Sequence, residues 1–140
     1  MRVDDPNLPY LRQIAEALGD LRAQVVFLGG AVAGLLVTDP LADSVRATRD
    51  VDAVVNANRA IFHRIEQTVA QRGFARDVTS DVICRWIHKD SGVLFDLMPV
   101  QPEVLGFSNR WYAYAVESAE PVELSPDLTI RLVSAVAFIA

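Results

Sequence analysis

Apolar positions near the N-terminus recur with the period of a helix. They share one helical face, and Gly19 follows the last of them directly. Glycine commonly ends helices because it has no Cβ to restrict its backbone. The pattern therefore predicts an amphipathic first helix, whose apolar face consists of Leu8, Leu11, Ile14, Ala15 and Leu18.

The next segments alternate between strand and helix patterns. Residues 24–28 are rich in β-branched and aromatic side chains, which favours a buried strand. This strand runs through Gly29-Gly30 into a small-residue segment, 31–36, that we expect to be helical. A polar loop to about Thr48 and a second strand over 51–55 follow.

The pattern of a helix returns once more and then gives way to short strands. We expect a helix over 60–72, preceded by Asn58 and closed by Gly73. After Gly73 the extended segments are separated by turn formers, and residues 89–92 read as a hairpin connection. The predicted strands are 74–78, 83–88, 93–100, 111–116 and 121–124.

This order predicts an α/β (α+β) domain with a mixed β-sheet and helices packed mainly on one face. A length of 140 residues fits a single domain over 1–140. The terminal stretch 132–140 reads as a helix that stops without a capping glycine or a polar tail. We therefore expect the chain to be the N-terminal part of a longer protein with a C-terminal helical part.

Composition narrows the class of protein. The chain is 51% hydrophobic, so it should fold. Because its formal net charge is -5, it should not bind nucleic acid through overall charge alone. Its one cysteine, Cys84, excludes an intrachain disulfide and a cysteine-based zinc site. The charged, proline-broken N-terminus and the glycine-interrupted apolar run 25–37 favour neither a signal peptide nor a membrane span. A cytoplasmic location is the simplest expectation.

The sharpest chemical feature is the segment Thr48-Arg49-Asp50-Val51-Asp52. Because side chains alternate along a strand, Asp50 and Asp52 point to the same face. Two like charges side by side are unfavourable unless a cation compensates them. Carboxylates are hard oxygen ligands, so the fitting ion is Mg²⁺ or Mn²⁺.

A third acid interrupts a later apolar strand. Asp96 lies between Phe95 and Leu97 and is costly to bury unless it is paired or bound to metal. On a strand beside Asp50 and Asp52 it would complete a three-carboxylate site for phosphoryl or nucleotidyl transfer. The turn at Gly29 and Gly30 would then leave room for the triphosphate.

Together these motifs resemble the nucleotidyltransferase superfamily with the polymerase-β-like fold. They are most similar to the AbiEii-type toxin branch over roughly residues 25–100. The resemblance implies that Asp50, Asp52 and Asp96 are catalytic and bind Mg²⁺, with Asp96 activating the acceptor hydroxyl. It implies that Gly29 and Gly30 cradle the phosphates of an NTP and that Thr48 and Arg49 flank them. A lysine common after the last strands of that branch is not found after Lys89.

The resemblance also implies a substrate and a partner. It points to transfer of an NMP to RNA, in particular tRNA, in a toxin-antitoxin or abortive-infection system with a cognate antitoxin. A protein acceptor, a small-molecule acceptor such as an aminoglycoside, and a catalytically silent nucleotide-binding or interaction module stay open. Metal-dependent phosphohydrolysis ranks behind these, because the chain lacks a histidine-rich ligand set.

Other chemistry-bearing residues have ordinary structural explanations. His63 is expected on an exposed helix face, His88 at a strand end and Cys84 in the core. The aromatic side chains of 111–114 are expected to pack the late strands rather than stack a base. The scattered arginines are expected to be solvated, although they are also candidates for a phosphate-facing groove: Arg46, Arg49, Arg85 and Arg110.

Overall fold

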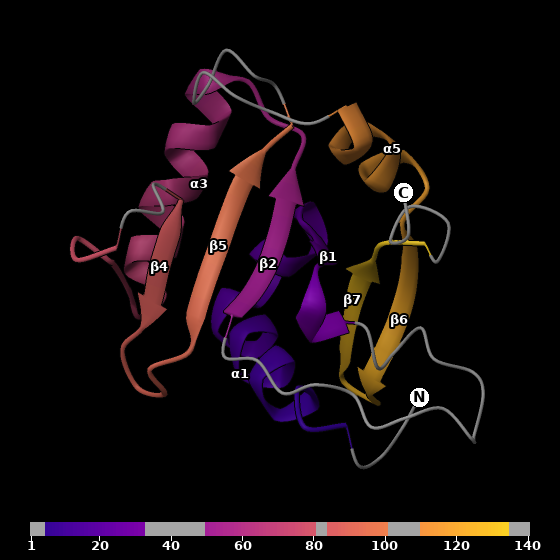
Figure 1. The fold of residues 1–140 in the computed structure, drawn as a ribbon, viewed down its shortest axis with the longest axis horizontal. Helices are drawn as coiled ribbons and strands as arrows, with labels where there is room; N and C mark the ends of the chain where they lie inside the picture. The colour runs from indigo at the N-terminus through magenta and orange to yellow at the C-terminus, as the bar shows by residue number, and fades with distance from the viewer. Residues whose placement is uncertain (1–4, 33–49, 81–83, 101–109, 135–140) are drawn as a thin grey trace.

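A seven-stranded mixed sheet forms the centre of the protein, in the order β3-β4-β5-β2-β1-β7-β6 (Figure 1). The structure is a computed structural model that describes residues 5–32, 50–80, 84–100 and 110–134. The strands are β1 (Val26–Leu28), β2 (Asp50–Val55), β3 (Phe74–Arg76), β4 (Arg85–His88), β5 (Leu94–Pro99), β6 (Glu120–Ser125) and β7 (Leu128–Leu132). The helices are α1 (Leu8–Leu18), α3 (Arg59–Gln71), α5 (Arg110–Glu117) and the 3₁₀ helices η1 (Gly19–Gln24) and η2 (Gly30–Val32).

The first helix forms as its apolar period predicts. α1 ends at Leu18, and Gly19 follows with a positive φ of 58°. A 3₁₀ helix, η1, continues from that glycine before β1 begins. The whole predicted apolar face is buried in the core: Leu8, Leu11, Ile14, Ala15 and Leu18.

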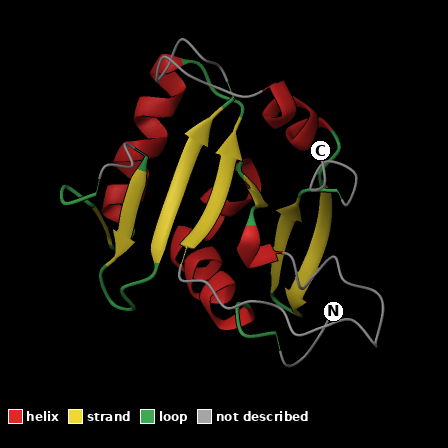
Figure 2. Cartoon of the chain, viewed as in Figure 1, coloured by secondary structure: helices red, strands yellow, loops and turns green. Residues whose placement is uncertain are grey.

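The second long helix begins at a side-chain cap. Asn58 is the N-cap of α3, and its side chain accepts a hydrogen bond of 2.9 Å from the backbone N–H of Ile61. This contact satisfies one of the backbone donors that a helix start leaves unpaired. The helix then buries Phe62, Ile65 and Val69. In Figures 1 and 2, α1 and α3 both lie behind the sheet.

The centre of the sheet combines parallel and antiparallel pairs. β2 pairs with β5 in parallel and with β1 in antiparallel orientation. β1 in turn pairs with β7 in parallel. Val51, Ala53 and Val55 are buried on one face of β2, and they alternate with Asp50 and Asp52 on the other. The mixed sheet with helices confirms the predicted fold class at this coarse level.

The predicted hairpin also forms. β4 and β5 are antiparallel neighbours joined by residues 89–93. Gly92 adopts φ 73°, and its N–H donates to the carbonyl of His88 at 2.7 Å. A glycine is favoured here because the left-handed backbone region carries no steric cost without a Cβ.

One predicted strand is wrong. Residues 111–116 belong to a helix, α5, and the backbone N–H of Ser118 continues its i to i−4 bonding to the carbonyl of Tyr114 at 2.9 Å. The Arg131 guanidinium on β7 donates to the carbonyl of Val116 at 3.2 Å, near the C-terminal end of the helix. A cation there satisfies an unpaired carbonyl and interacts favourably with the helix dipole. This support comes from a distant strand and leaves no trace in the local pattern.

A further strand was not predicted. β7 shows strict alternation, with Leu128, Ile130 and Leu132 buried and the residues between them less so. Leu132 therefore ends a strand rather than beginning a helix, and the N–H of Val133 donates to the carbonyl of Phe27 at 3.0 Å. The predicted helix over 31–36, apart from its first two residues, the loop to Thr48 and the end of the predicted terminal helix lie outside the described residues. Within the described part of the chain, no helix is long and apolar enough to cross a membrane.

Candidate functional site

The candidate site is built around two carboxylates on β2. Asp50 and Asp52 alternate with buried Val51 and Ala53, so both acids lie on one face of the strand. Asp50 begins the strand and keeps 43% of its side chain exposed. Asp52 lies further along, where the neighbouring strands flank it on both sides. The predicted shared orientation of these two acids is confirmed.

The parallel pairing of β2 and β5 brings the third acid to the same place. Asp52 is the register partner of Asp96, and Asp50 is the partner of Leu94. Asp96 is 7% exposed, although it is charged. Side chains directly opposite each other in adjacent strands lie about 5 Å apart. The three acids predicted from separate motifs are thus neighbours on the sheet.

Burial and the crowding of negative charge change the acidity of the middle carboxyl. The pKa of Asp52 rises from 3.8 to about 7, because burial disfavours its charged form and the charge of Asp96 repels it. A hydrogen bond between the Asp52 and Asp96 side chains and the charge of Asp50 raise it further, while Arg85 opposes the shift. A carboxyl group that titrates near neutral pH is typical of functional sites.

The backbone of Gly29 passes very close to this carboxyl. β1 ends beside Asp52, with Leu28 as its register partner, and Gly29 follows with φ 82°. A Cβ at position 29 would clash with Oδ2 of Asp52. Position 29 therefore needs glycine for two reasons, the backbone conformation and the contact with Asp52. Gly30 then begins η2, whose backbone closes with a 3.2 Å bond from the N–H of Val32 to the carbonyl of Gly29.

Arg85 is part of the cluster, so the expectation of a solvated arginine is wrong at this position, and its pairing with Asp96 was not predicted. It lies on β4 as the register partner of Asp96. Its Nε donates to Oδ1 of Asp96 at 2.8 Å, and its Nη2 donates to Oδ2 at 2.9 Å. Nη2 also lies 3.4 Å from Oδ2 of Asp50. These contacts raise the pKa of the guanidinium, chiefly through its hydrogen bond to Asp96.

The signal for Arg85 is present in the sequence. The arginine interrupts an otherwise apolar strand between buried Cys84 and Trp86, just as Asp96 interrupts β5. Two opposite charges placed inside apolar strands suggest that they pair, because neither is stable alone in the interior. Their register could not be deduced before the pairing of β4 with β5 was known.

The donor set fits a divalent cation in type and charge. Three carboxylates face one guanidinium, so the cluster keeps a negative charge, and oxygen ligands suit Mg²⁺ or Mn²⁺. Among the described residues, however, no group of three His, Cys, Asp or Glu side chains is arranged to hold a metal ion as it stands. Both oxygens of Asp96 are engaged by Arg85 instead.

Several candidate residues lie elsewhere. Thr48 and Arg49, together with Arg46, are outside the described residues, so their predicted contacts with phosphates stay predictions. His63 is exposed on α3, as expected for an ordinary surface histidine, and its Nε2 lies 3.3 Å from Nε2 of Gln67. His88 ends β4, where its Nδ1 lies 2.7 Å from Oγ of Ser91.

Cys84 is a buried free thiol beside the cluster. Burial and the negative charge of Asp96 raise its pKa to about 11. A nucleophilic cysteine needs a lowered pKa, so this environment favours the structural role predicted for it.

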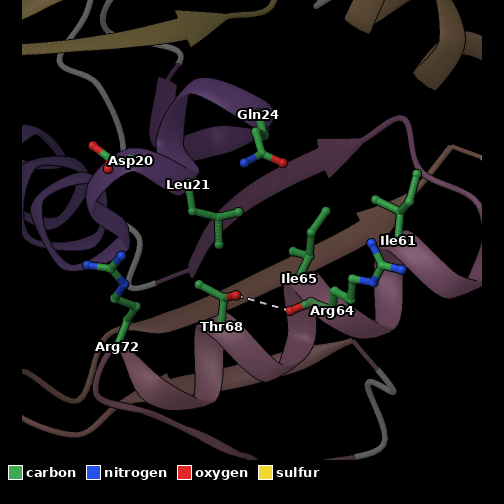
Figure 3. Close-up of a pocket in the computed structure, with 8 residues that line it drawn as sticks. All are labelled: Asp20, Leu21, Gln24, Ile61, Arg64, Ile65, Thr68 and Arg72. Carbon is green, nitrogen blue, oxygen red and sulfur yellow. Dashed lines mark hydrogen bonds between the residues drawn. The ribbon is translucent and has the colours of Figure 1, made fainter.

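A cavity of about 330 Å³ lies apart from the acids, between η1 and α3 (Figure 3). None of the residues that line it belongs to the acidic cluster. They are Asp20, Leu21, Gln24, Ile61, Arg64, Ile65, Thr68 and Arg72. The candidate site is therefore a cluster on one face of the sheet and not the cavity.

Comparison with known proteins identifies no relative of this chain. No family model matches the chain. No curated protein matches it either. The expected relationship with the nucleotidyltransferase superfamily thus stays a prediction.

Proposed function

We propose that this chain is a Mg²⁺-dependent nucleotidyltransferase domain that transfers an NMP from an NTP to a hydroxyl group. The observation that carries the proposal is the register of β2 with β5, which sets Asp52 beside Asp96 with Asp50 on the same face. Carboxylates on neighbouring strands are the ligands that a metal-assisted displacement at phosphorus requires.

Each acid has a role in this proposal. Asp50, Asp52 and Asp96 would hold Mg²⁺, which when bound would neutralise charge developing on the phosphate oxygens. The acceptor oxygen forms a bond to the α-phosphorus, the bond to the bridging oxygen breaks, and pyrophosphate leaves. Asp96 takes the proton of the attacking hydroxyl. Gly29 and Gly30 would allow close approach of the triphosphate, since neither carries a side chain.

The acceptor and the cellular setting extend the same proposal. The motifs around Gly29, Asp50 and Asp96 suggest a toxin-like enzyme that acts on RNA, in particular tRNA, in the cytoplasm with a cognate antitoxin. With a net charge of -5, binding of RNA would depend on a local group of arginines rather than on overall charge. Protein and small-molecule acceptors compete with RNA in this proposal.

A second candidate is a catalytically silent nucleotide-binding or interaction module of the same fold. The observation that favours it is the two-point contact of Arg85 with Asp96, which engages both oxygens of the proposed base. An ion pair of this kind can exist simply to satisfy a buried acid, with no role in catalysis. The two candidates differ in whether the acids bind a metal ion.

Calorimetric titration of each NTP with Mg²⁺ into the wild-type protein and into Asp50→Ala/Asp52→Ala decides between them. The transferase predicts NTP binding that needs Mg²⁺ and disappears in the double variant. Asp90→Ala, which removes an exposed carboxylate from the β4–β5 turn, is the control and should bind as the wild type does. Binding that is unchanged by EDTA, or no binding at all, would overturn the transferase proposal.

A further inference from the structure

Arg85 is the cation that contacts the acidic cluster, among the side chains that the structure describes. Its side chain is only 18% exposed, and the side chain of Asp96 is 10% exposed. The two hydrogen bonds of 2.8 and 2.9 Å form the planar two-point contact that arginine makes with a carboxylate. The pair is thus a specific, partly buried element of the site.

The same oxygens have two competing uses. Both oxygens of Asp96 already accept from Arg85, and one oxygen of Asp50 lies 3.4 Å from the same guanidinium. A divalent cation held by these carboxylates would lie within a few ångströms of a permanent positive charge. Like charges at that distance in a partly buried site repel each other strongly. Metal binding and the Arg85–Asp96 contact therefore oppose each other.

We infer that Arg85 is a built-in counter-cation that competes with the divalent metal ion for Asp96, so that metal binding releases the guanidinium from this carboxylate. This inference rests on the proposed function. It makes Arg85 a regulating residue that offsets part of the negative charge of the cluster in the metal-free protein and limits its affinity for metal. A purely positioning role for Arg85 would have the opposite effect, because removal of the guanidinium would then disorder Asp96 and weaken metal binding.

Direct Mn²⁺ titration of the 140-residue protein tests the inference without any activity measurement. Free Mn²⁺ is followed by electron paramagnetic resonance for the wild type and for the variants Arg85→Gln and Arg85→Lys. Arg85→Gln should bind Mn²⁺ about tenfold more tightly than the wild type, since one repulsive charge is removed. Arg85→Lys keeps the charge but loses the two-point contact, so its affinity should lie between the two.

Two controls separate the effect from general electrostatics and from misfolding. Arg64→Gln removes the same charge from an exposed position on α3 and should change the affinity less than twofold. In the folded wild type, the ¹⁵N resonance of Arg85 Nε should shift during a Mg²⁺ titration, with the midpoint of Mg²⁺ binding to the cluster. That shift keeps the inference testable if Arg85→Gln does not fold.

The outcomes distinguish the inference from the proposed function. Wild-type binding that depends on Asp50 and Asp52 but weakens or stays the same in Arg85→Gln overturns the counter-cation role and leaves the transferase standing. An unmoved Arg85 resonance at saturating Mg²⁺ does the same. Absence of Mn²⁺ binding in the wild type and in both Arg85 variants overturns both.

Discussion

Asp52 on β2 and Asp96 on β5 are register partners in two adjacent parallel strands. Their carboxyl groups come from segments 44 positions apart in the chain, and hydrogen-bonded pairing of the two strands places them side by side. The cost of burying Asp52 and placing it beside Asp96 is visible in the pKa of Asp52, which lies at about 7. The sheet therefore holds the acids in an arrangement that opposes folding at neutral pH and favours cations.

The stability of the metal-free protein should fall as the pH rises from about 4 to about 7. The pKa of Asp52 is about 7 in the folded protein, whereas its ordinary value is 3.8. The folded protein therefore binds more protons than the unfolded protein between these two pH values. The stabilisation is complete below 3.8 and is lost as the pH rises through 7. We expect Asp52→Asn to reduce the change in unfolding free energy between these pH values by roughly a few kcal/mol, since one pKa unit corresponds to about 1.4 kcal/mol.

Urea unfolding in EDTA at several pH values measures this effect. Asp90→Asn, on the exposed β4–β5 turn, is the matched control and should leave the slope of the wild type unchanged. The same dependence of the unfolding free energy on pH in the wild type and in Asp52→Asn would contradict the raised pKa of Asp52.

Substitution of Gly29 should be much more damaging than the same substitution at Gly92. Both glycines have positive φ, at 82° and 73°, but a Cβ at 29 meets Asp52 whereas at 92 nothing lies within 4 Å. We expect Gly92→Ala to cost about 1 kcal/mol of unfolding free energy, from backbone strain alone. Gly29→Ala should cost about 3 kcal/mol or more, because the clash adds to that strain.

Chemical denaturation of the two variants compares these costs directly. The proposed transferase function further predicts that Gly29→Ala loses Mg²⁺-dependent NTP binding, while Gly92→Ala retains it. Equal destabilisation by the two substitutions would show that Asp52 does not pack against the backbone at position 29.

Cys84 should resist alkylation and disulfide exchange in the native protein. The residue is 5% exposed, and a thiol pKa of about 11 leaves little thiolate at pH 8. We expect reaction with Ellman's reagent at pH 8 to be at least about a hundredfold slower than in guanidinium chloride. The absorbance of the released thiol follows both reactions, and a native rate close to the denatured one would contradict the buried environment.

Loss of the α3 cap should cost about 1 kcal/mol. Asn58→Ala removes the side-chain acceptor of the Ile61 N–H, whereas Asn58→Asp keeps an oxygen in the same place. We therefore expect urea unfolding to show a lower midpoint for Asn58→Ala and a midpoint near that of the wild type for Asn58→Asp. Equal losses in the two variants would mean that the hydrogen bond contributes nothing to α3.

The local pattern by itself determined the elements that depend on short-range chemistry. The apolar period and Gly19 defined α1, Asn58 and Gly73 bracketed α3, and Gly92 marked the hairpin between β4 and β5. The alternation along β2 also placed Asp50 and Asp52 on one face. These features follow from backbone geometry over a few residues, which is why they could be predicted.

Only the tertiary structure decided the rest, since it depends on contacts between distant segments. α5 is a helix whose end is supported by Arg131, and β7 was hidden because the apolar run that begins at Leu132 obscured the alternation before it. The contact of Arg85 with Asp96 and the approach of Gly29 to Asp52 arise from strand register, which no local spacing specifies. The acids were evident in the sequence, but the cation that balances them was decided by the pairing of β4 with β5.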